Sequence, residues 1–120
     1  MKRDLDLIRK IVLAIEEAPT GFAPTLSFDG YTQAQIGYHA WLLIDAGYAT
    51  GADMTNMGSE GPEAMLRSLT WAGHEFADAA RDDSRWNKAL GMVKEKTGTV
   101  TIDLLKQLLG TLMKAALGLP

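Results

Sequence analysis

The chain has 120 residues, of which 47% are hydrophobic, 22% charged and 8% aromatic, and it contains no cysteine. This length fits one compact domain, and the composition is that of a globular protein, which excludes collagen-like and wholly disordered chains. The absence of cysteine excludes disulfides, thiolate metal sites and a cysteine nucleophile. The formal net charge of −3 is the wrong sign for a protein whose whole surface binds nucleic acid.

We expect no secretory signal at the start of the sequence and no membrane span in its tail. Apolar and charged residues alternate after Met1-Lys2-Arg3-Asp4, without the uninterrupted apolar stretch of a secretory signal. The apolar tail at 100–119 carries Asp103, Lys106 and Lys114 on one helical stripe, which indicates an amphipathic helix and not a membrane span. We therefore expect a cytoplasmic protein without membrane contact.

The N-terminal part of the sequence predicts a helix, a short strand and a second helix. Apolar residues recur at helical spacing over 4–17. Residues 22–28 favour a short edge strand, although Pro24 prevents pairing on one side. Thr32 is a good N-cap for a helix over 33–46.

A hairpin and three further helices are expected after residue 47. Strands over 48–54 and 64–69 flank a glycine-rich, serine-rich tip at 55–63, which is the pattern of a wing. The expected helices are one after Thr70 that extends to residue 80, one over 85–96 with Asp83 or Ser84 as its N-cap, and one that begins after Thr101.

This order of elements predicts a mainly α fold with a small β-hairpin. We interpret residues 1–81 as a winged helix-turn-helix domain and residues 82–120 as a C-terminal helical extension, either packed on the domain or used for dimerisation. One usual element of a winged helix is not indicated, because residues 22–31 lack the pattern of a short scaffold helix.

Four stretches of the chain resemble an uncharacterised protein family that is common in phages and prophages. They read MKRDLDLIRKI at 1–11, IGYHAWLLIDAG at 36–47, LTWAGHEF at 69–76 and ARDDSRWNK at 80–88. The resemblance implies a winged-helix-like fold and a mobile-element context. It implies no catalytic residues, because the family supplies none.

The distribution of charge bears most directly on function. Residues 11–66 contain no lysine or arginine, yet they contain seven acidic residues: Glu16, Glu17, Asp29, Asp45, Asp53, Glu60 and Glu63. This span includes the helix and the hairpin that contact DNA in winged-helix proteins, and DNA affinity depends on cations that neutralise phosphates. DNA binding is therefore disfavoured, and Gln33, Gln35 and His39 are the remaining candidates for base contacts.

The outward face of the helix over 33–46 is expected to hold Tyr38, Trp41, Leu42 and Asp45. An exposed aromatic group with an acidic neighbour is typical of a protein-binding surface. The alternative is that Trp41 and Leu42 are buried beneath the C-terminal helices, since large apolar residues are usually inside.

A basic patch near the start of the extension is a second candidate site. Arg81, Arg85 and Lys88 follow i, i+4, i+7 spacing and are candidates for nucleic-acid or phosphate contact. Asp82 and Asp83 lie beside them, which favours the alternative of a solvated face with local ion pairs.

No pattern of catalytic or metal-binding residues is present. His39 and His74 lie on different predicted helices and lack a third ligand at metal-binding spacing. No serine lies in a nucleophile elbow, and the adjacent carboxylates of Asp82 and Asp83 point in different directions on a helix. We expect no catalytic residue, no metal and no cofactor, and therefore not an enzyme.

The C-terminal tail is apolar over a wider arc than one small domain easily buries. Leu105, Leu109 and Leu112 are candidates for a homodimer contact, and the alternative is that they pack within the chain.

Together these patterns favour a non-enzymatic binding protein that contacts a host or phage protein, and the resemblance implies that it belongs to a phage or mobile element. An anti-CRISPR-like inhibitor of a host nucleic-acid-handling or defence system is one such protein. The alternative is a winged-helix, DNA-binding transcriptional regulator.

Overall fold

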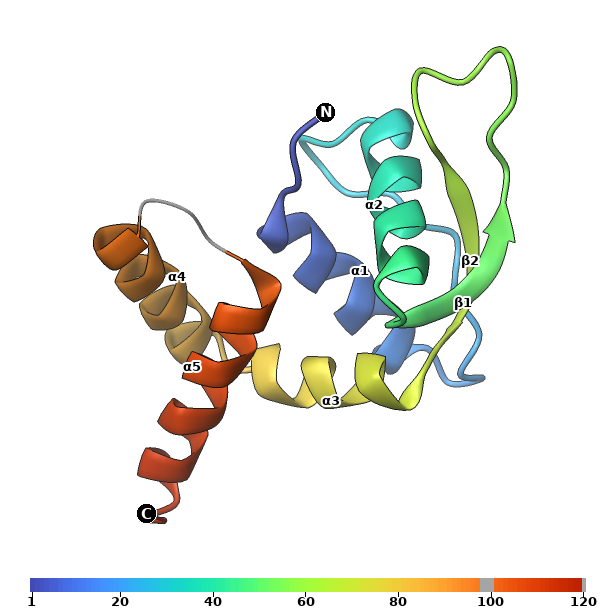
Figure 1. Cartoon of the computed structure of the whole chain (residues 1–120). Coiled ribbons are helices and arrows are strands. Elements are labelled where there is room, and N and C mark those ends of the chain that lie inside the picture. Colours follow the sequence, from blue (N-terminus) through green and yellow to red (C-terminus); the bar gives the residue numbers. More distant parts are fainter. Residues whose placement is uncertain (98–100, 120) are drawn as a thin grey trace. The chain divides into compact units, whose positions relative to one another are not determined.

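The structure, a computed structural model, describes residues 1–97 and 101–119. It is mainly helical with one two-stranded antiparallel sheet, as predicted. In chain order the elements are α1 (Leu5–Glu17), α2 (Gln33–Asp45), β1 (Ala49–Asp53), β2 (Ala64–Leu69), α3 (Trp71–Ala80), α4 (Asp83–Thr97) and α5 (Ile102–Ala116) (Figure 1). No helix in the described part of the chain is long and apolar enough to cross a membrane.

The chain divides into two compact units, Met1–Ala77 and Asp78–Pro120, with the boundary inside α3. The boundary expected from the sequence lies a few residues later, after residue 81. We refer to these parts as the N-terminal unit and the C-terminal unit and describe each by itself.

The core of the N-terminal unit forms around one face of α1. This helix begins after Asp4, whose Oδ1 accepts a hydrogen bond from the Leu7 N–H at 3.1 Å. Its apolar face contacts α2 and β2. The buried apolar side chains of this unit are Leu7, Ile8, Ile11, Val12, Ile15, Ile36, Ala40, Leu43, Tyr48, Ala49, Leu66, Leu69, Phe76 and Ala77.

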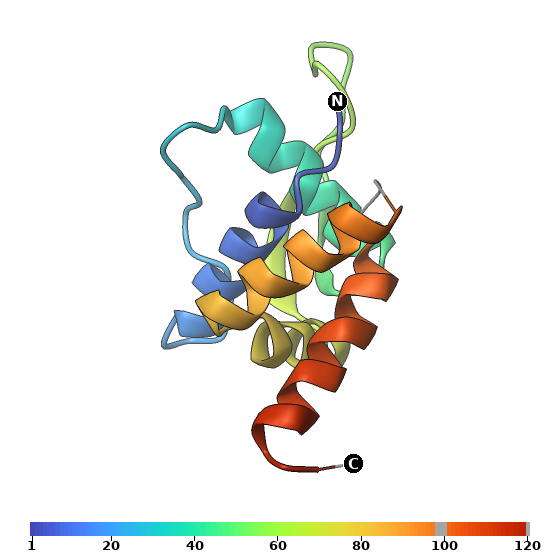
Figure 2. The ribbon, with the colours of Figure 1, turned by 90° about the vertical axis from the view of Figure 1, so that its left-hand side faces the viewer.

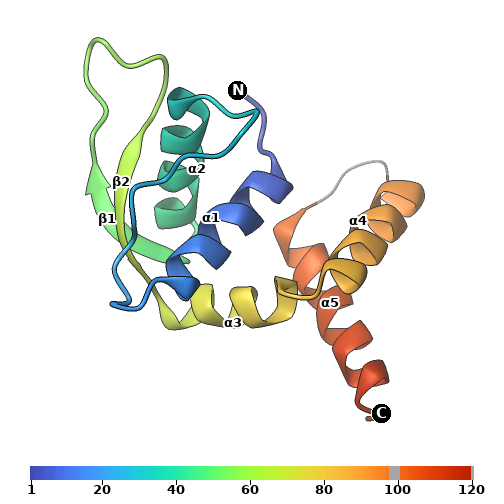
Figure 3. The same cartoon turned by 180° about the vertical axis from the view of Figure 1, so that it is seen from behind.

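The edge strand expected at 22–28 is absent, and this part of the prediction is wrong. The segment is extended and runs past β2 and α2 (Figure 3), and the Ala23 N–H donates to the Arg67 carbonyl at 2.7 Å. Pro24 follows and has no N–H, so the chain cannot continue a regular ladder from this bond. No helix forms at 22–31 either, so an extended segment takes the place of the winged-helix scaffold helix.

Helix α2 begins with the predicted cap. The Thr32 Oγ1 accepts from the Gln35 N–H at 3.1 Å, and the Gln35 Oε1 accepts from the Thr32 N–H at 2.8 Å. This reciprocal capping box satisfies two backbone donors at the helix start. At the other end the chain turns at Gly47, whose φ of +81° is readily adopted only by glycine.

The strands β1 and β2 form the predicted antiparallel hairpin. The register pairs Ala49 with Leu69 and Asp53 with Ala64, and an irregularity between Thr50 and Gly51 interrupts the ladder. Next in the chain, Thr70 caps α3 by accepting from the Gly73 N–H at 3.2 Å, as expected from the sequence.

The C-terminal unit contains a helix pair, α4 and α5, which pack against each other (Figure 2). Helix α4 is capped by Asp82, whose Oδ1 accepts from the Arg85 N–H at 2.8 Å, rather than by Asp83 or Ser84. Helix α5 has the predicted cap, Thr101. The buried apolar side chains of this unit are Ala80, Trp86, Ala89, Val93, Leu105 and Leu109.

Candidate protein-binding face

The four residues expected on the outward face of α2 lie together and keep part of their surface. The rings of Tyr38 and Trp41 stack with centroids 6.4 Å apart and an angle of 8° between their planes. Tyr38, Trp41 and Leu42 are half-buried, and Asp45 is exposed. Stacking pre-orders the two rings, which lowers the conformational cost of binding a partner through them.

Trp41 also connects α2 to the hairpin. Hydrogen bonds from the Thr55 side chain and backbone, and a smaller contribution from the Trp41 side chain, lower the pKa of the Asp53 carboxyl. The Thr55 N–H donates to Asp53 Oδ1 at 2.9 Å. Asp53 therefore remains ionised at neutral pH, and it contributes negative charge beside the aromatic pair.

His39 is buried in the N-terminal unit, with only 1% of its surface exposed. The Asp4 N–H donates to its Nε2 at 2.8 Å, so the ring proton lies on Nδ1 and is donated to the Gln35 carbonyl at 2.7 Å. The side chain thus holds the start of α1 against α2. Burial and the use of both ring nitrogens favour a structural role for His39 over the predicted base contact.

A second hydrogen bond joins Asp4 to the loop before α2. The Tyr31 hydroxyl donates to Asp4 Oδ2 at 3.1 Å. Burial, followed by this hydrogen bond to Asp4, raises the pKa of Tyr31. Asp4 therefore caps α1 and anchors the loop before α2 at the same time.

The two glutamines near the start of α2 are committed to local contacts. Gln35 completes the capping box described above, and the Gln33 Nε2 donates to the Leu26 carbonyl at 3.3 Å. Gln33 is exposed and Gln35 is half-buried. Of the three residues predicted to contact bases, only Gln33 keeps an exposed side chain.

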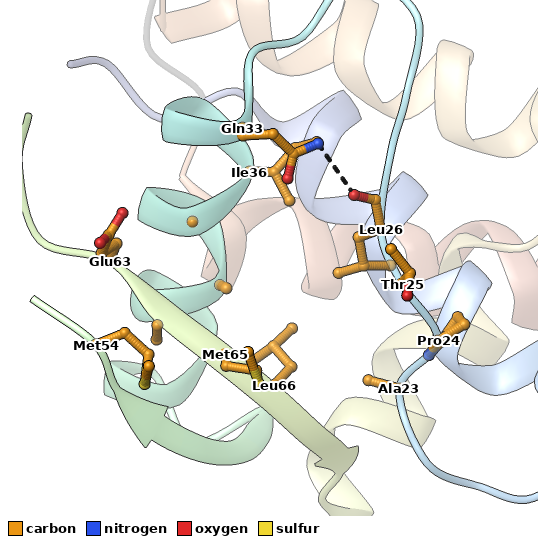
Figure 4. A pocket seen from close by; sticks show the side chains of 13 residues that line it. Ala23, Pro24, Thr25, Leu26, Gln33, Ile36, Met54, Glu63, Met65 and Leu66 are labelled. Carbon is orange, nitrogen blue, oxygen red and sulfur yellow. Dashed lines mark hydrogen bonds between the residues drawn. The ribbon is translucent and has the colours of Figure 1, made fainter. Parts of the chain in front are cut away.

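A groove of about 520 Å³ lies between α2, β2 and the extended segment (Figure 4). Gln33 and its bond to Leu26 stand at one end, and Met54, Met65 and Glu63 lie on the hairpin side. Gly37 permits the close approach of α2 to the hairpin, since a Cβ there would lie 3.1 Å from the Cβ of Glu63. No motif in the sequence predicted this groove, because its walls come from segments that are distant in the chain.

The hairpin tip is closed by polar contacts and exposes methionines. The Thr55 Oγ1 donates to the Glu63 carbonyl at 3.2 Å and accepts from the Glu63 N–H at 3.0 Å. The Ser59 Oγ donates to Glu63 Oε1 at 2.9 Å. Met54 and Met57 are exposed, Met57 completely. Exposed thioethers suit an adaptable contact surface.

The three cations of the predicted basic patch do not share one helix. Arg81 lies before α4 and forms an exposed ion pair with Asp78 at 2.9 Å, so the assumed helical spacing is wrong. Arg85 is half-buried and Lys88 is exposed, both on α4. This arrangement matches the alternative of a solvated face with local ion pairs more closely than a phosphate site.

Two of the three leucines expected at a dimer contact are core residues. Leu105 and Leu109 have no exposed surface, and only Leu112 is half-buried. Leu105 and Leu109 therefore pack within the chain, which was the alternative to a dimer contact. Among the described residues, no group of three or more His, Asp or Glu side chains is placed to hold a metal ion.

Residues 2–99 match the model of a family described as a hypothetical protein, DUF2513. The chain belongs to this family. It is also 34% identical to an uncharacterized protein of Haemophilus influenzae over 120 residues, which covers 98% of this chain and 99% of that protein. No solved structure gives a significant match to the chain.

Proposed function

We propose that this DUF2513 protein is a non-enzymatic binding protein that acts by contact with a basic surface of another protein. The observation that carries the proposal is the span 11–66, which has seven carboxylates and no lysine or arginine. Complementary charge speeds association and selects partners. The stacked pair Tyr38 and Trp41 supplies the aromatic anchor that such interfaces use.

The proposal includes a cytoplasmic location and a phage or mobile-element context. In that context the basic surface would belong to a host nucleic-acid-handling or defence protein, whose own nucleic-acid site is basic. An acidic protein that occupies such a site acts as an inhibitor without any chemistry of its own.

Affinity capture with matched tryptophan variants tests the proposal. Tagged full-length protein, Trp41→Ala and Trp71→Ala are each used to capture partners from lysate of the bacterium that carries the gene. Trp71 lies on α3, is 82% exposed and serves as the control for removing an indole. We expect Trp41→Ala to lose about 2 kcal/mol of binding, or thirtyfold in affinity, while Trp71→Ala retains the partner.

The same proteins are assayed by gel shift against DNA from upstream of the gene. We expect no complex at physiological salt, because α2 and the hairpin tip carry no cation. A salt-dependent nanomolar complex with that DNA would refute the proposal and establish the transcriptional regulator instead.

A further inference from the structure

The groove beside α2 has an apolar floor and an adaptable rim. Ile36, Ala40 and Leu66 are buried along its base, and Met54 and Met65 are 48% and 65% exposed at its edge. Its volume of about 520 Å³ accommodates several side chains of a ligand. An aliphatic side chain placed there leaves water for a pre-formed apolar surface, which is favourable.

One wall of the groove is a strand edge. The Met54 N–H donates to the Glu63 carbonyl at 2.9 Å, so the backbone of Glu63 faces β1. Backbone groups alternate in direction along a strand, so those of Ala64 point away from β1, and Ala64 lines the groove. A strand edge of this kind is the template to which an extended segment adds.

The chain itself uses only one end of this edge. The Ala23 N–H reaches the Arg67 carbonyl, and the segment then separates from β2 as it passes Pro24 and Leu26 (Figure 4). Among the described residues, no backbone hydrogen bond joins 24–28 to 64–66. The groove is the space left by this divergence.

The electrostatics of the groove select a cationic occupant. Glu63 stands at its hairpin side, and none of the lining residues is a lysine or arginine. Asp53 and Glu60 add negative charge on the same hairpin. Arg67 lies outside the lining, 5.8 Å from the centroid of the Phe22 ring.

We propose that this groove binds an extended segment of the partner protein in which aliphatic side chains alternate with lysine or arginine. The aliphatic side chain enters the floor at Ile36 and Leu66, the backbone pairs with the edge at Ala64, and the cation reaches Glu63. This inference rests on the proposed function, since it specifies which part of a basic protein is bound.

Fluorescence anisotropy with three labelled peptides tests the groove on the full-length protein. The peptides alternate lysine with valine, lysine with serine, and serine with valine. We expect the lysine–valine peptide to bind about tenfold more tightly than either of the others, because only it satisfies both the floor and Glu63. Equal binding of the lysine–serine peptide would refute the groove and indicate charge attraction alone.

Three variants locate the binding. Glu63→Gln keeps an acceptor for Ser59 while it removes the charge, and it should weaken the lysine–valine peptide about threefold or more. Glu60→Gln changes the same charge on the hairpin outside the groove and should have no such effect. Ala64→Leu fills the groove and should abolish binding of this peptide, with thermal melting as the check that each variant is folded.

The outcomes separate this inference from the proposed function. If Glu63→Gln and Ala64→Leu both leave peptide affinity unchanged, the groove is not the site, whatever the peptide's affinity. The affinity capture from lysate tests the dependence on Trp41 and does not use these peptides. A Trp41-dependent partner together with a failed peptide assay therefore refutes the groove and leaves the proposed function intact.

Discussion

The two units of the chain use charge and apolar surface in opposite ways. Met1–Ala77 contains ten acidic residues and five cations, whereas Asp78–Pro120 contains five acidic residues and seven cations. The N-terminal unit leaves Trp41 half-buried and Met54 exposed beside a groove. In the C-terminal unit, two of the three leucines predicted to contact a partner, Leu105 and Leu109, are buried instead.

This difference shows what an amphipathic pattern can and cannot predict. The spacing in α2 and in α5 identifies an apolar face in both helices, but it does not say what covers that face. Charge is more informative here, because a span without cations keeps that property however the chain folds. The protein-binding hypothesis therefore rests on the acidic span and not on the leucine-rich tail.

The largest effect is expected from breaking the core of the C-terminal unit. Leu105→Ala removes a side chain with no exposed surface and should lower the free energy of unfolding by about 2–5 kcal/mol. Leu104→Ala is the control on the same helix, since Leu104 is 42% exposed and its loss should cost about 0.5 kcal/mol. Urea denaturation measures both.

Light scattering on the same samples completes this test. If Leu105 and Leu109 contributed to a dimer interface, Leu105→Ala would convert a dimer into a stable monomer with little change in unfolding. That result would contradict the core role assigned to these residues and restore the dimer hypothesis.

Substitution of one glycine in each unit, Gly73 and Gly91, allows the packing of the two units to be compared. A Cβ at Gly73 would overlap the carbonyl oxygen of Tyr48, and backbone cannot move aside cheaply. Gly73→Ala should therefore destabilise the protein by about 1–3 kcal/mol. Gly91 on α4 has open space around its Cβ position, so Gly91→Ala should stabilise by about 0.5–1 kcal/mol.

Thermal melting measures both glycine variants, and equal shifts for the two would show that the contact between Gly73 and Tyr48 is not a constraint.

Local chemistry made most of the fold predictable from sequence. Thr32 and Thr101 cap helices where expected, and the hairpin has the predicted strands. The errors concern contacts between distant segments. The 22–28 segment has strand propensity but leaves β2 beyond Ala23, and His39 is buried because Asp4 reaches it from another helix. No spacing rule within one segment reports either contact.

The candidate site was predictable only in part, for the same reason. The pairing of Tyr38 with Trp41 was predictable, because helical periodicity places residues three apart on one face. The groove needs α2, β2 and the extended segment together, so no single motif encodes it. Glu63 belonged to the acidic span, but its place at the groove depends on tertiary structure.

The two histidines allow a buried and an exposed residue of the N-terminal unit to be compared, since His39 is buried and His74 is exposed. His39→Ala leaves the Asp4 N–H and the Gln35 carbonyl without their partner, and these bonds are part-buried. We expect His39→Ala to lower the free energy of unfolding by an amount toward the lower end of about 1–3 kcal/mol. His74→Ala, on the exposed side of α3, should change it by about 0.5 kcal/mol or less.

Chemical denaturation at pH 7 compares the two histidine variants. A His39→Ala protein as stable as His74→Ala would mean that His39 is free for another role, including the base contact that its burial argues against.

The smallest effect tests whether α2 and the hairpin tip form one surface. The pKa of Asp53 is lowered mainly by Thr55 and to a lesser extent by Trp41. A lowered pKa means that the folded tip favours the ionised carboxylate, so this contribution is present above the unfolded value of 3.8 and is lost as pH falls through the folded pKa. Thr55→Val should raise the Asp53 pKa more than Trp41→Phe does, and both should raise it. Carboxyl-carbon NMR titration measures the shifts. An unchanged Asp53 titration in Trp41→Phe would mean that the indole does not reach the tip in solution, and the aromatic pair and the acidic hairpin would then be separate surfaces.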